Sequence, residues 1–213
     1  MANITKKHIL DVILDQVQDE DNKLWSYEDL LNWENLGERT IVSLNPLANS
    51  KRESIKLASG VKQSIPAGGI AFIRVIRNMG TDGATAGTGV TPATVEAMTS
   101  FYPSWSTQTA TQEIINAMPD PNDPTIFYVY PASDGTGYVE EEFSVVPPIV
   151  AYDDDGDWES AHIGIREGYV DPLMNYIFHR AYGKDTDIPG NKERSAEYHG
   201  LFLGAMGISK GGG

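Results

Sequence analysis

The sequence contains no cysteine. This absence excludes a disulfide scaffold, thiol catalysis and thiolate zinc sites, and it fits assembly in a reducing compartment. Basic residues are also scarce, with 16 Lys and Arg against 30 Asp and Glu and a formal net charge of -14. Because affinity for phosphates comes from Lys and Arg, this balance argues against a monomer that grips a nucleic acid backbone.

Long apolar runs are missing as well. The longest, around Phe72 to Ile76 and Ser144 to Val150, fall far short of the roughly 18–20 residues that a membrane span needs. The N-terminal residues have no apolar stretch of the kind found in secretion signals. A chain of 213 residues allows one large domain or two small ones. We therefore expect a soluble, intracellular, globular protein with no membrane partner.

Helical periodicity marks the N-terminal region. An apolar stripe predicts a helix over residues 5–18. Ser26 is placed to cap a second helix, which is predicted to end by Asn45-Pro46 because the residue before proline disfavours the α region. The stripe of this second helix comprises Leu30, Trp33, Gly37, Ile41 and Leu44. A glycine inside the stripe predicts a close approach by another helix.

The C-terminal region is predicted to be helical again, over residues 166–183 and roughly 189–206. Pro172 either lies in the first turn of the former helix, with Asp171 as its cap, or kinks it. The predicted face of that helix comprises Tyr169, Leu173, Tyr176, Ile177, Arg180 and Ala181. The apolar side predicted for the last helix comprises Ala196, Leu201, Phe202, Ala205 and Met206.

Between these regions the hydrophobic period changes from 3.6 to 2. Residues 54–65 alternate around Ala58-Ser59-Gly60, which predicts a β-hairpin. Further strands are predicted over residues 70–78, 125–130 and 138–146. In the first of these, strict alternation predicts that Arg74 and Arg77 lie on opposite faces.

The order of elements predicts an α+β fold, because runs of helices and strands are segregated along the chain. Residues 1–50 and 158–206 are predicted to form one helical bundle, with an antiparallel β domain, residues 51–148, inserted between them. That domain would include a long Gly/Thr/Ser/Ala loop, residues 80–112, with one helical turn near its centre. Residues 207–213 are predicted to form a flexible tail.

No motif supports catalysis or metal binding. The acidic cluster around Asp155 does not fit a calcium loop, because Ala151 and His162 occupy positions that need carboxylates. The four histidines, His8, His162, His179 and His199, lack zinc-ligand spacing. The glycines of the 80–112 loop lack the lysine of a phosphate-binding loop, and no serine lies in a G-x-S-x-G elbow. We therefore expect no catalytic residue, no metal site and no cofactor.

Two segments have the composition of assembly surfaces. Phe101, Tyr102 and Trp105 place three aromatic rings within five residues of a polar loop, so they are either interface anchors or fold back onto their own sheet. Ile208 and Lys210 belong to a glycine-rich end, which is either frayed or an arm that becomes ordered on a partner.

Five short sequence motifs, here called words, occur in order along nearly the whole chain. They are Trp25-Ser26-Tyr27-Glu28-Asp29-Leu30-Leu31, Leu57-x-x-Gly60 with Ile65-Pro66, Arg74-x-x-Arg77-Asn78-Met79-Gly80, Asp123-Pro124-x-x-Phe127-Tyr128-Val129-Tyr130-Pro131, and Tyr176-x-x-x-Arg180-Ala181-Tyr182-x-Lys184-Asp185. With these words, the chain resembles the head-to-tail adaptor (connector) proteins of short-tailed bacteriophages. The 80–112 loop departs most from that pattern.

The resemblance implies a non-enzymatic virion protein of the neck or tail, assembled in the host cytoplasm. It implies a homo-oligomeric ring, usually of twelve subunits, that docks beneath the portal protein and presents a platform to a tail nozzle or other tail component. Helices would form the ring body around a central channel, and the C-terminal segment would reach the portal. Viral DNA would pass without specific binding, since an acidic wall repels phosphates.

The last word also supplies candidates for a subunit joint. Tyr176, Arg180 and Tyr182 are predicted to form a structural joint rather than a catalytic site, with Lys184 and Asp185 as further interface candidates. The guanidinium of Arg180 can stack on a ring and bind a carboxylate through two donors. Its partner would be Asp185 or a carboxylate of a neighbouring subunit.

Two other functions stay open at this point. One is another tail-completion or neck structural protein. The other is a small hydrolase, or a ligand-binding module such as a carbohydrate-binding one, that uses the aromatic loop. An adaptor predicts rings with or on a twelvefold partner, whereas a binding module predicts a monomer with measurable ligand affinity.

Overall fold

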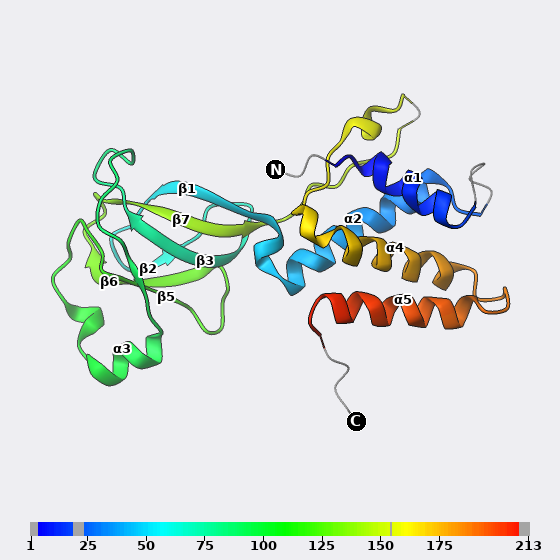
Figure 1. The fold of residues 1–213 in the computed structure, drawn as a ribbon. Helices are drawn as coiled ribbons and strands as arrows, with labels where there is room; N and C mark the ends of the chain where they lie inside the picture. Colours follow the sequence, from blue (N-terminus) through cyan, green and yellow to red (C-terminus); the bar gives the residue numbers. More distant parts are fainter. Residues whose placement is uncertain (1–3, 19–23, 154, 209–213) are drawn as a thin grey trace. The chain divides into compact units, whose positions relative to one another are not determined.

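The computed structural model describes residues 4–18, 24–153 and 155–208 (Figure 1). The chain divides into two compact units. Met1–Asn49 and Pro147–Gly213 form one, here called the helical unit, and Ser50–Val146 form the other, here called the β unit. Helices precede and follow the strands along the chain, so the predicted α+β fold class is confirmed.

The helical unit contains all four predicted helices. Its described elements are α1 (Lys6–Gln16), α2 (Tyr27–Leu44), η1 (Pro46–Asn49), η3 (Asp157–Ser160), η4 (Glu167–Tyr169), α4 (Val170–Lys184) and α5 (Asn191–Ala205). The predicted cap of α2 is confirmed, because the Ser26 hydroxyl accepts a hydrogen bond from the Asp29 amide. The buried apolar residues of α1, α2 and α4 include Ile9, Leu10, Ile13, Leu30, Leu31, Ile41, Leu173 and Ile177.

Helices α2 and α4 approach closely at Gly37. A Cβ atom at this position would lie 2.7 Å from Leu173 Cδ1 and 2.9 Å from Tyr176 Cδ1. Real Cβ contacts are longer, so a side chain at position 37 would push α4 away. The helix contact predicted from the glycine in the stripe is confirmed.

Three details of the predicted helix faces are wrong. Leu44 is exposed, although it continues the stripe of α2. Pro172 lies in the first turn of α4, as one alternative required, but the cap residue is Tyr169 instead of Asp171. On α5 the predicted residues Ala196, Leu201 and Ala205 are exposed, whereas the buried residues are Asn191, Ser195 and Phe202. The two buried polar residues are hydrogen-bonded, since Ser195 donates to the His179 carbonyl of α4 and Asn191 donates to the carbonyl of Asp185, which follows α4.

The β unit consists of two sheets and a short helix. Its elements are β1 (Ser50–Lys56), β2 (Gly60–Ser64), β3 (Gly69–Asn78), β4 (Thr91–Pro92), α3 (Val95–Phe101), η2 (Trp105–Thr107), β5 (Asn116–Pro119), β6 (Ile126–Ser133) and β7 (Tyr138–Val145). The strand orders are β1-β7-β3 and β2-β6-β5-β4. All pairs are antiparallel except β4 with β5. The strands predicted over residues 70–78, 125–130 and 138–146 are confirmed.

The predicted hairpin over residues 54–65 is wrong. Strand β1 pairs with β7 and β2 pairs with β6, so the two segments belong to different sheets. The buried Gln63 side chain accepts a hydrogen bond from the Ala58 amide and donates to the carbonyls of Ala58 and Gly60. The backbone of the connection is thereby bonded locally, and each strand takes a partner distant in sequence.

The predicted placement of Arg74 and Arg77 on opposite faces is also wrong. Register shifts interrupt the pairing of β3 with β7 between Phe72 and Arg74 and between Val75 and Arg77. A β-bulge inserts one residue into one strand and so resets the alternation. Arg74 therefore lies opposite Glu142, and Arg77 lies opposite Glu140. These glutamates are two residues apart and share one face of β7.

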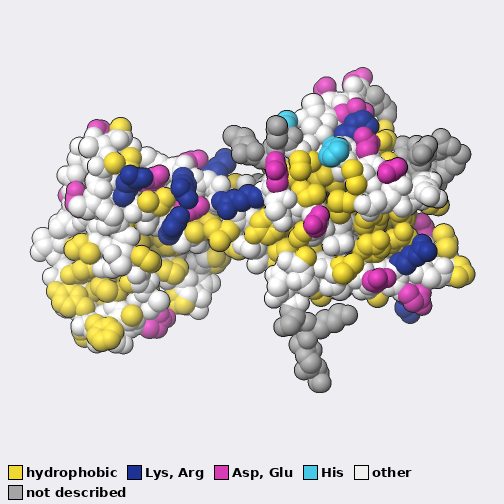
Figure 2. Space-filling view, viewed as in Figure 1, with side chains coloured by type: hydrophobic (Ala, Val, Ile, Leu, Met, Phe, Trp, Pro, Cys, Tyr) yellow, Lys and Arg dark blue, Asp and Glu magenta, His cyan; other side chains and the backbone are white. Residues whose placement is uncertain are grey.

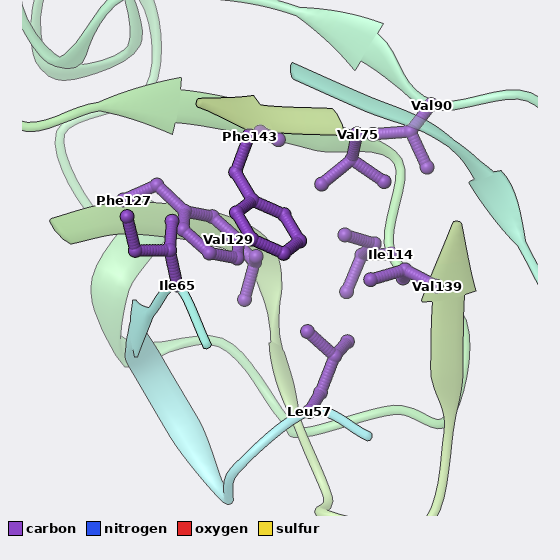
Figure 3. Close-up of a cluster of buried hydrophobic side chains, with 10 residues drawn as sticks. Leu57, Ile65, Val75, Val90, Ile114, Phe127, Val129, Val139 and Phe143 are labelled. Atoms are coloured by element: carbon purple, nitrogen blue, oxygen red, sulfur yellow. The ribbon is translucent and has the colours of Figure 1, made fainter. Parts of the chain in front are cut away.

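Apolar side chains from both sheets form the core of the β unit (Figure 3). The core comprises Leu57, Ile65, Val75, Val90, Ile114, Ala117, Phe127, Val129, Val139 and Phe143. Phe72 packs against this core, and its ring stacks on that of Phe127 at a centroid distance of 4.3 Å. Burial of each such large side chain contributes roughly 1.5–3 kcal/mol.

Part of the predicted 80–112 loop forms regular secondary structure. It contains β4, α3 and η2, and the single predicted turn extends to a helix that ends at Phe101. The buried Asn78 amide donates to the Ile114 carbonyl, while its Oδ1 accepts from the Ile114 amide. Strand β5, which follows the loop, had no signal in the sequence because only four residues form it.

Candidate assembly surfaces

The aromatic segment of the β unit, residues 101–105, contains one buried ring, that of Trp105, and one largely exposed ring, that of Phe101. Helix α3 is capped by Thr94 and ends at Phe101, whose side chain is 88% exposed. Trp105 is buried, packs edge-on against Tyr128 and donates through its indole to Thr99 Oγ1 at 3.2 Å. The ring of Tyr102 packs edge-on against that of Tyr130, with the two ring centroids 5.5 Å apart. Trp105 therefore folds back onto its own sheet, whereas Phe101 is held out in solvent.

Figure 2 shows hydrophobic side chains gathered over α3 on the surface of the β unit. An exposed phenylalanine at the end of a capped helix costs free energy in water, since its apolar area stays hydrated. Exposed apolar groups of this kind typically mark interaction sites. The sequence allowed these aromatic residues to fold back onto their own sheet or to act as interface anchors. Trp105 folds back onto the sheet, whereas Phe101 is available as an anchor.

Three of the C-terminal candidates meet at the start of α2, within the helical unit. Trp25 packs edge-on against Tyr182 at a centroid distance of 5.2 Å and donates through Nε1 to Asp185 Oδ2 at 3.3 Å. Lys184 Nζ lies 2.7 Å from Asp29 Oδ2. The hydrogen bond from Lys184 lowers the pKa of Asp29, and the same bond raises the pKa of Lys184. Together they fasten the C-terminal end of α4 to the N-terminal end of α2.

Tyr176 and Arg180 lie apart from this joint. Tyr176 contacts Gly37 of α2 and packs edge-on against Phe202 of α5 at 5.4 Å. Arg180 is exposed, and across the described ranges no ion pair joins it to a carboxylate. Asp185, the partner that the sequence suggested for it, accepts its hydrogen bond from Trp25.

The seam between α4 and α5 contains two of the four histidines. His179 Nδ1 lies 3.0 Å from both the carbonyl and the hydroxyl oxygen of Ser195. Its ring stacks on His199 at a centroid distance of 4.5 Å. Burial lowers the pKa of His179, which favours the neutral ring. These histidines are packing residues in this structure, and Ser195 is buried because it bonds to α4.

The described part of the tail ends α5. Gly207 has a φ of +72°, and the Ile208 amide donates to the Leu203 carbonyl at 2.8 Å. This is the arrangement in which a left-handed glycine closes a helix. Ile208 is half-buried, and Lys210 lies outside the described residues.

Sequence reasoning missed a cluster of charges inside the helical unit. Lys6 Nζ lies 3.0 Å from Glu38 and 3.9 Å from Glu34, and all three side chains are 0% exposed. Glu38 Oε1 also accepts from the Gly164 amide at 2.8 Å. Burial raises the pKa of Glu34 to about 8, although nearby Lys6 opposes the shift. The signal was available: each charge falls on the buried stripe of its helix.

A second missed cluster lies on the sheet β1-β7-β3. Glu142 is buried beneath Arg52 and Arg74, whose guanidinium nitrogens lie 3.5 and 2.9 Å from Oε2. Beside it, Arg77 Nε lies 2.6 Å from Glu140. No sequence pattern could have shown this cluster, because its members come from three strands.

Among the described residues, no group of three or more His, Asp or Glu side chains is placed to hold a metal ion. Within the same ranges, no helix combines the length and the apolar character needed to cross a membrane.

The comparisons with known proteins bear on the chain as a whole. No curated protein gives a significant match. The SU10 adaptor protein family matches residues 5–212, a range that includes both units and all candidate residues. This match confirms the resemblance to phage head-to-tail adaptors. The chain therefore belongs to the SU10 adaptor protein family, a family of structural adaptor proteins of phages.

Proposed function

We propose that this protein forms a ring beneath the portal, links the capsid to the tail and lines the conduit for viral DNA. The family match over residues 5–212 carries the proposal. Twelve subunits are the expected number, as in the adaptors that the chain resembles. In a closed ring the contacts are heterologous, so each subunit must present two different surfaces that fit one another.

The charge of the protein suits a conduit. A formal net charge of -14 per subunit is multiplied in a ring. An acidic wall repels phosphates, so DNA can slide past without being held. The acidity therefore supports a passage and counts against a DNA-binding role.

Phe101 and Tyr102 are the proposed anchors for another virion component. Phe101 is 88% exposed, and its position is fixed because Tyr102 and Trp105 pack on the neighbouring strand β6. A rigid exposed aromatic ring can enter a pocket of a partner at little cost in conformational entropy.

The helical unit supplies the other proposed contacts. Tyr176, Tyr182, Lys184 and Asp185 hold α4 against its neighbours, and Arg180 projects from the same helix into solvent. Arg180 is the proposed contact with a carboxylate of a neighbouring subunit. The tail that contains Ile208 and Lys210 is the proposed arm toward the portal.

Mass photometry of the purified protein, alone and mixed with its cognate portal, tests this function. We expect a portal complex that contains several copies of the chain. Phe101→Ala is expected to reduce portal or tail-component binding, whereas Ile115→Ala, which removes another exposed apolar side chain of the β unit, is not. A chain that stays monomeric and does not bind the portal would overturn the proposal.

Deletion of residues 209–213 tests the arm. The deletion leaves the Gly207 and Ile208 closure of α5 in place, so the melting temperature should not change. Portal binding should weaken. Undiminished binding by the shortened chain would contradict the arm.

A further inference from the structure

Basic side chains are unevenly distributed over the β unit. The chain has no Lys or Arg between residues 78 and 165. The β unit holds six of the 16 basic residues, and five of them lie on β1 and β3: Lys51, Arg52, Lys56, Arg74 and Arg77. The sixth, Lys62, lies on β2 in the other sheet. Figure 2 shows Lys and Arg side chains gathered over β1 and β7.

Four of these residues share the outer face of the sheet β1-β7-β3. Arg52 pairs with Glu142 in register from one side, and Arg74 pairs with it from the other. Lys56 follows Arg52 by four residues on β1 and so lies on the same face. Arg77 joins them because of the bulge in β3. We call Arg52, Lys56, Arg74 and Arg77 the arginine face.

Glutamates of β7 hold the arginines of this face in position. Burial by itself would raise the pKa of Glu142, yet hydrogen bonds from Arg74 and Ser50 and the charge of Arg52 lower it. An ionised, 4% exposed carboxylate thus orients two guanidinium groups. The side chains of Arg52, Arg74 and Arg77 nevertheless remain 55%, 53% and 44% exposed. Oriented and exposed guanidinium groups can bind a further carboxylate with little loss of entropy.

The sign of this face is opposite to that of the protein. Its four cations outnumber the two carboxylates between them, Glu140 and Glu142, whereas the whole chain carries -14. Copies of so acidic a chain repel one another unless their contact joins unlike charges. A heterologous contact can do so, because it joins different surfaces of the two subunits.

The densest run of acidic residues lies in the helical unit. Residues 153–159 contain Asp153, Asp155, Asp157 and Glu159 among the described positions and no basic residue. Asp155, Asp157 and Glu159 are exposed. We propose that the arginine face docks the acidic residues Asp153, Asp155, Asp157 and Glu159 of a neighbouring copy of this chain. The inference rests on the ring of the proposed function and names the charged part of its subunit contact.

Removal of single charges tests the docking. Arg77→Gln and Lys56→Gln alter the arginine face and leave the pairs of Glu142 intact, and Lys62→Gln is the control with the same charge change on the other sheet. Mass photometry over a salt series should show roughly tenfold weaker self-association for each face variant. The control should behave as wild type, and added salt should weaken the wild-type assembly. Thermal melts verify that each variant folds.

The absence of cysteine permits a direct second measurement. Chains with Arg77→Cys and chains with Asp157→Cys are mixed and treated with a short bis-maleimide. Crosslinked heterodimers are expected from this mixture. They are not expected when Lys62→Cys replaces the Arg77 variant.

The outcomes separate this surface from the ring itself. A wild-type ring that the face variants leave unchanged, without the crosslink, would overturn the docking and leave the adaptor function intact. A chain that is monomeric both alone and with the portal would overturn the ring, and this contact with it. Duplex DNA bound by the wild type and lost in the face variants would make the face a DNA contact and overturn the proposal.

Discussion

The two units of this protein differ in how far they enclose their buried ion pairs. The helical unit buries Lys6, Glu34 and Glu38 completely. The β unit buries Glu142 and keeps the arginines that pair with it at the surface. Charges that are fully enclosed can act only on the stability of the chain that contains them. Charges at a surface are also available to a partner.

The interior cluster avoids a large uncompensated charge. Burial raises the pKa of Glu34 to about 8, so this carboxyl is mostly protonated at neutral pH. The ammonium of Lys6 then faces the nearer carboxylate, Glu38, at 3.0 Å. Removal of one member of such a pair leaves the other buried and unpaired, which costs far more than the loss of an exposed pair.

The largest loss of stability is predicted for a variant of this buried cluster. Lys6→Met should lower the free energy of unfolding by about 3–5 kcal/mol, because Glu38 then keeps a buried charge without its partner. Chemical denaturation measures the change. Lys7→Met is the control: this neighbour is part-exposed and pairs with Asp11 at 3.1 Å, so it should cost about 1 kcal/mol or less. Equal losses in the two variants would show that enclosure of the charge is unimportant.

The β unit has its own buried carboxyl, Glu141, which is 0% exposed. Burial, helped by Glu53, raises its pKa from 4.5 to about 8. Between these values the folded state binds more protons at Glu141 than the unfolded state does, so the contribution of this group to stability is fully present below pH 4.5 and is lost as the pH rises to 8. At about 1.4 kcal/mol per pH unit, the loss for this group from pH 5 to 8 is up to about 4 kcal/mol.

Glu141→Gln should therefore flatten the pH dependence and make the protein more stable than wild type at pH 8. Denaturation at pH 5, 6.5 and 8 measures this difference. Glu140→Gln, on the opposite face of β7, should leave the dependence on pH unchanged. If the stability of the Glu141 variant depends on pH as that of the wild type does, the pKa of Glu141 is not raised in the folded protein.

Gly37→Ala tests the close contact between α2 and α4. The new methyl group would lie 2.7 Å from Leu173 Cδ1. Overpacking costs about 1–3 kcal/mol, and the better helix propensity of alanine returns about 1 kcal/mol, so we expect a net loss of about 1 kcal/mol. Gly204→Ala on α5 meets no atom within 4 Å and should stabilise by up to about 1 kcal/mol. A stabilising Gly37 variant would contradict the close approach.

The smallest effect on stability is expected at Arg180. This side chain is exposed, so Arg180→Ala should change the free energy of unfolding by no more than about 0.5 kcal/mol. Ring assembly should nevertheless weaken, and Arg180→Lys should restore it only in part, since lysine lacks the planar pair of donors. A loss above about 1 kcal/mol in the isolated chain would instead place Arg180 in an intramolecular joint.

Local signals determined much of this protein. The Ser26 hydroxyl caps α2 because its target amide is three residues away, and Pro172 stays in the first turn of α4 because its ring is tolerated there. Gly37 predicted a helix contact because only a residue without a side chain permits one so close. The order of five short words likewise sufficed for the family, which the match over residues 5–212 confirms.

Only the tertiary structure decided which distant segments meet. Strands β1 and β2 are adjacent in sequence but join different sheets, since the partner strand of each, β7 or β6, lies far away along the chain. The bulges of β3 moved Arg77 to the face of Arg74, and no alternation in the sequence announces a bulge. Lys6 can be buried because it forms an ion pair with Glu38 of another helix. The free energy of a charge or a strand edge depends on its partner, and the partner is fixed by the folded chain.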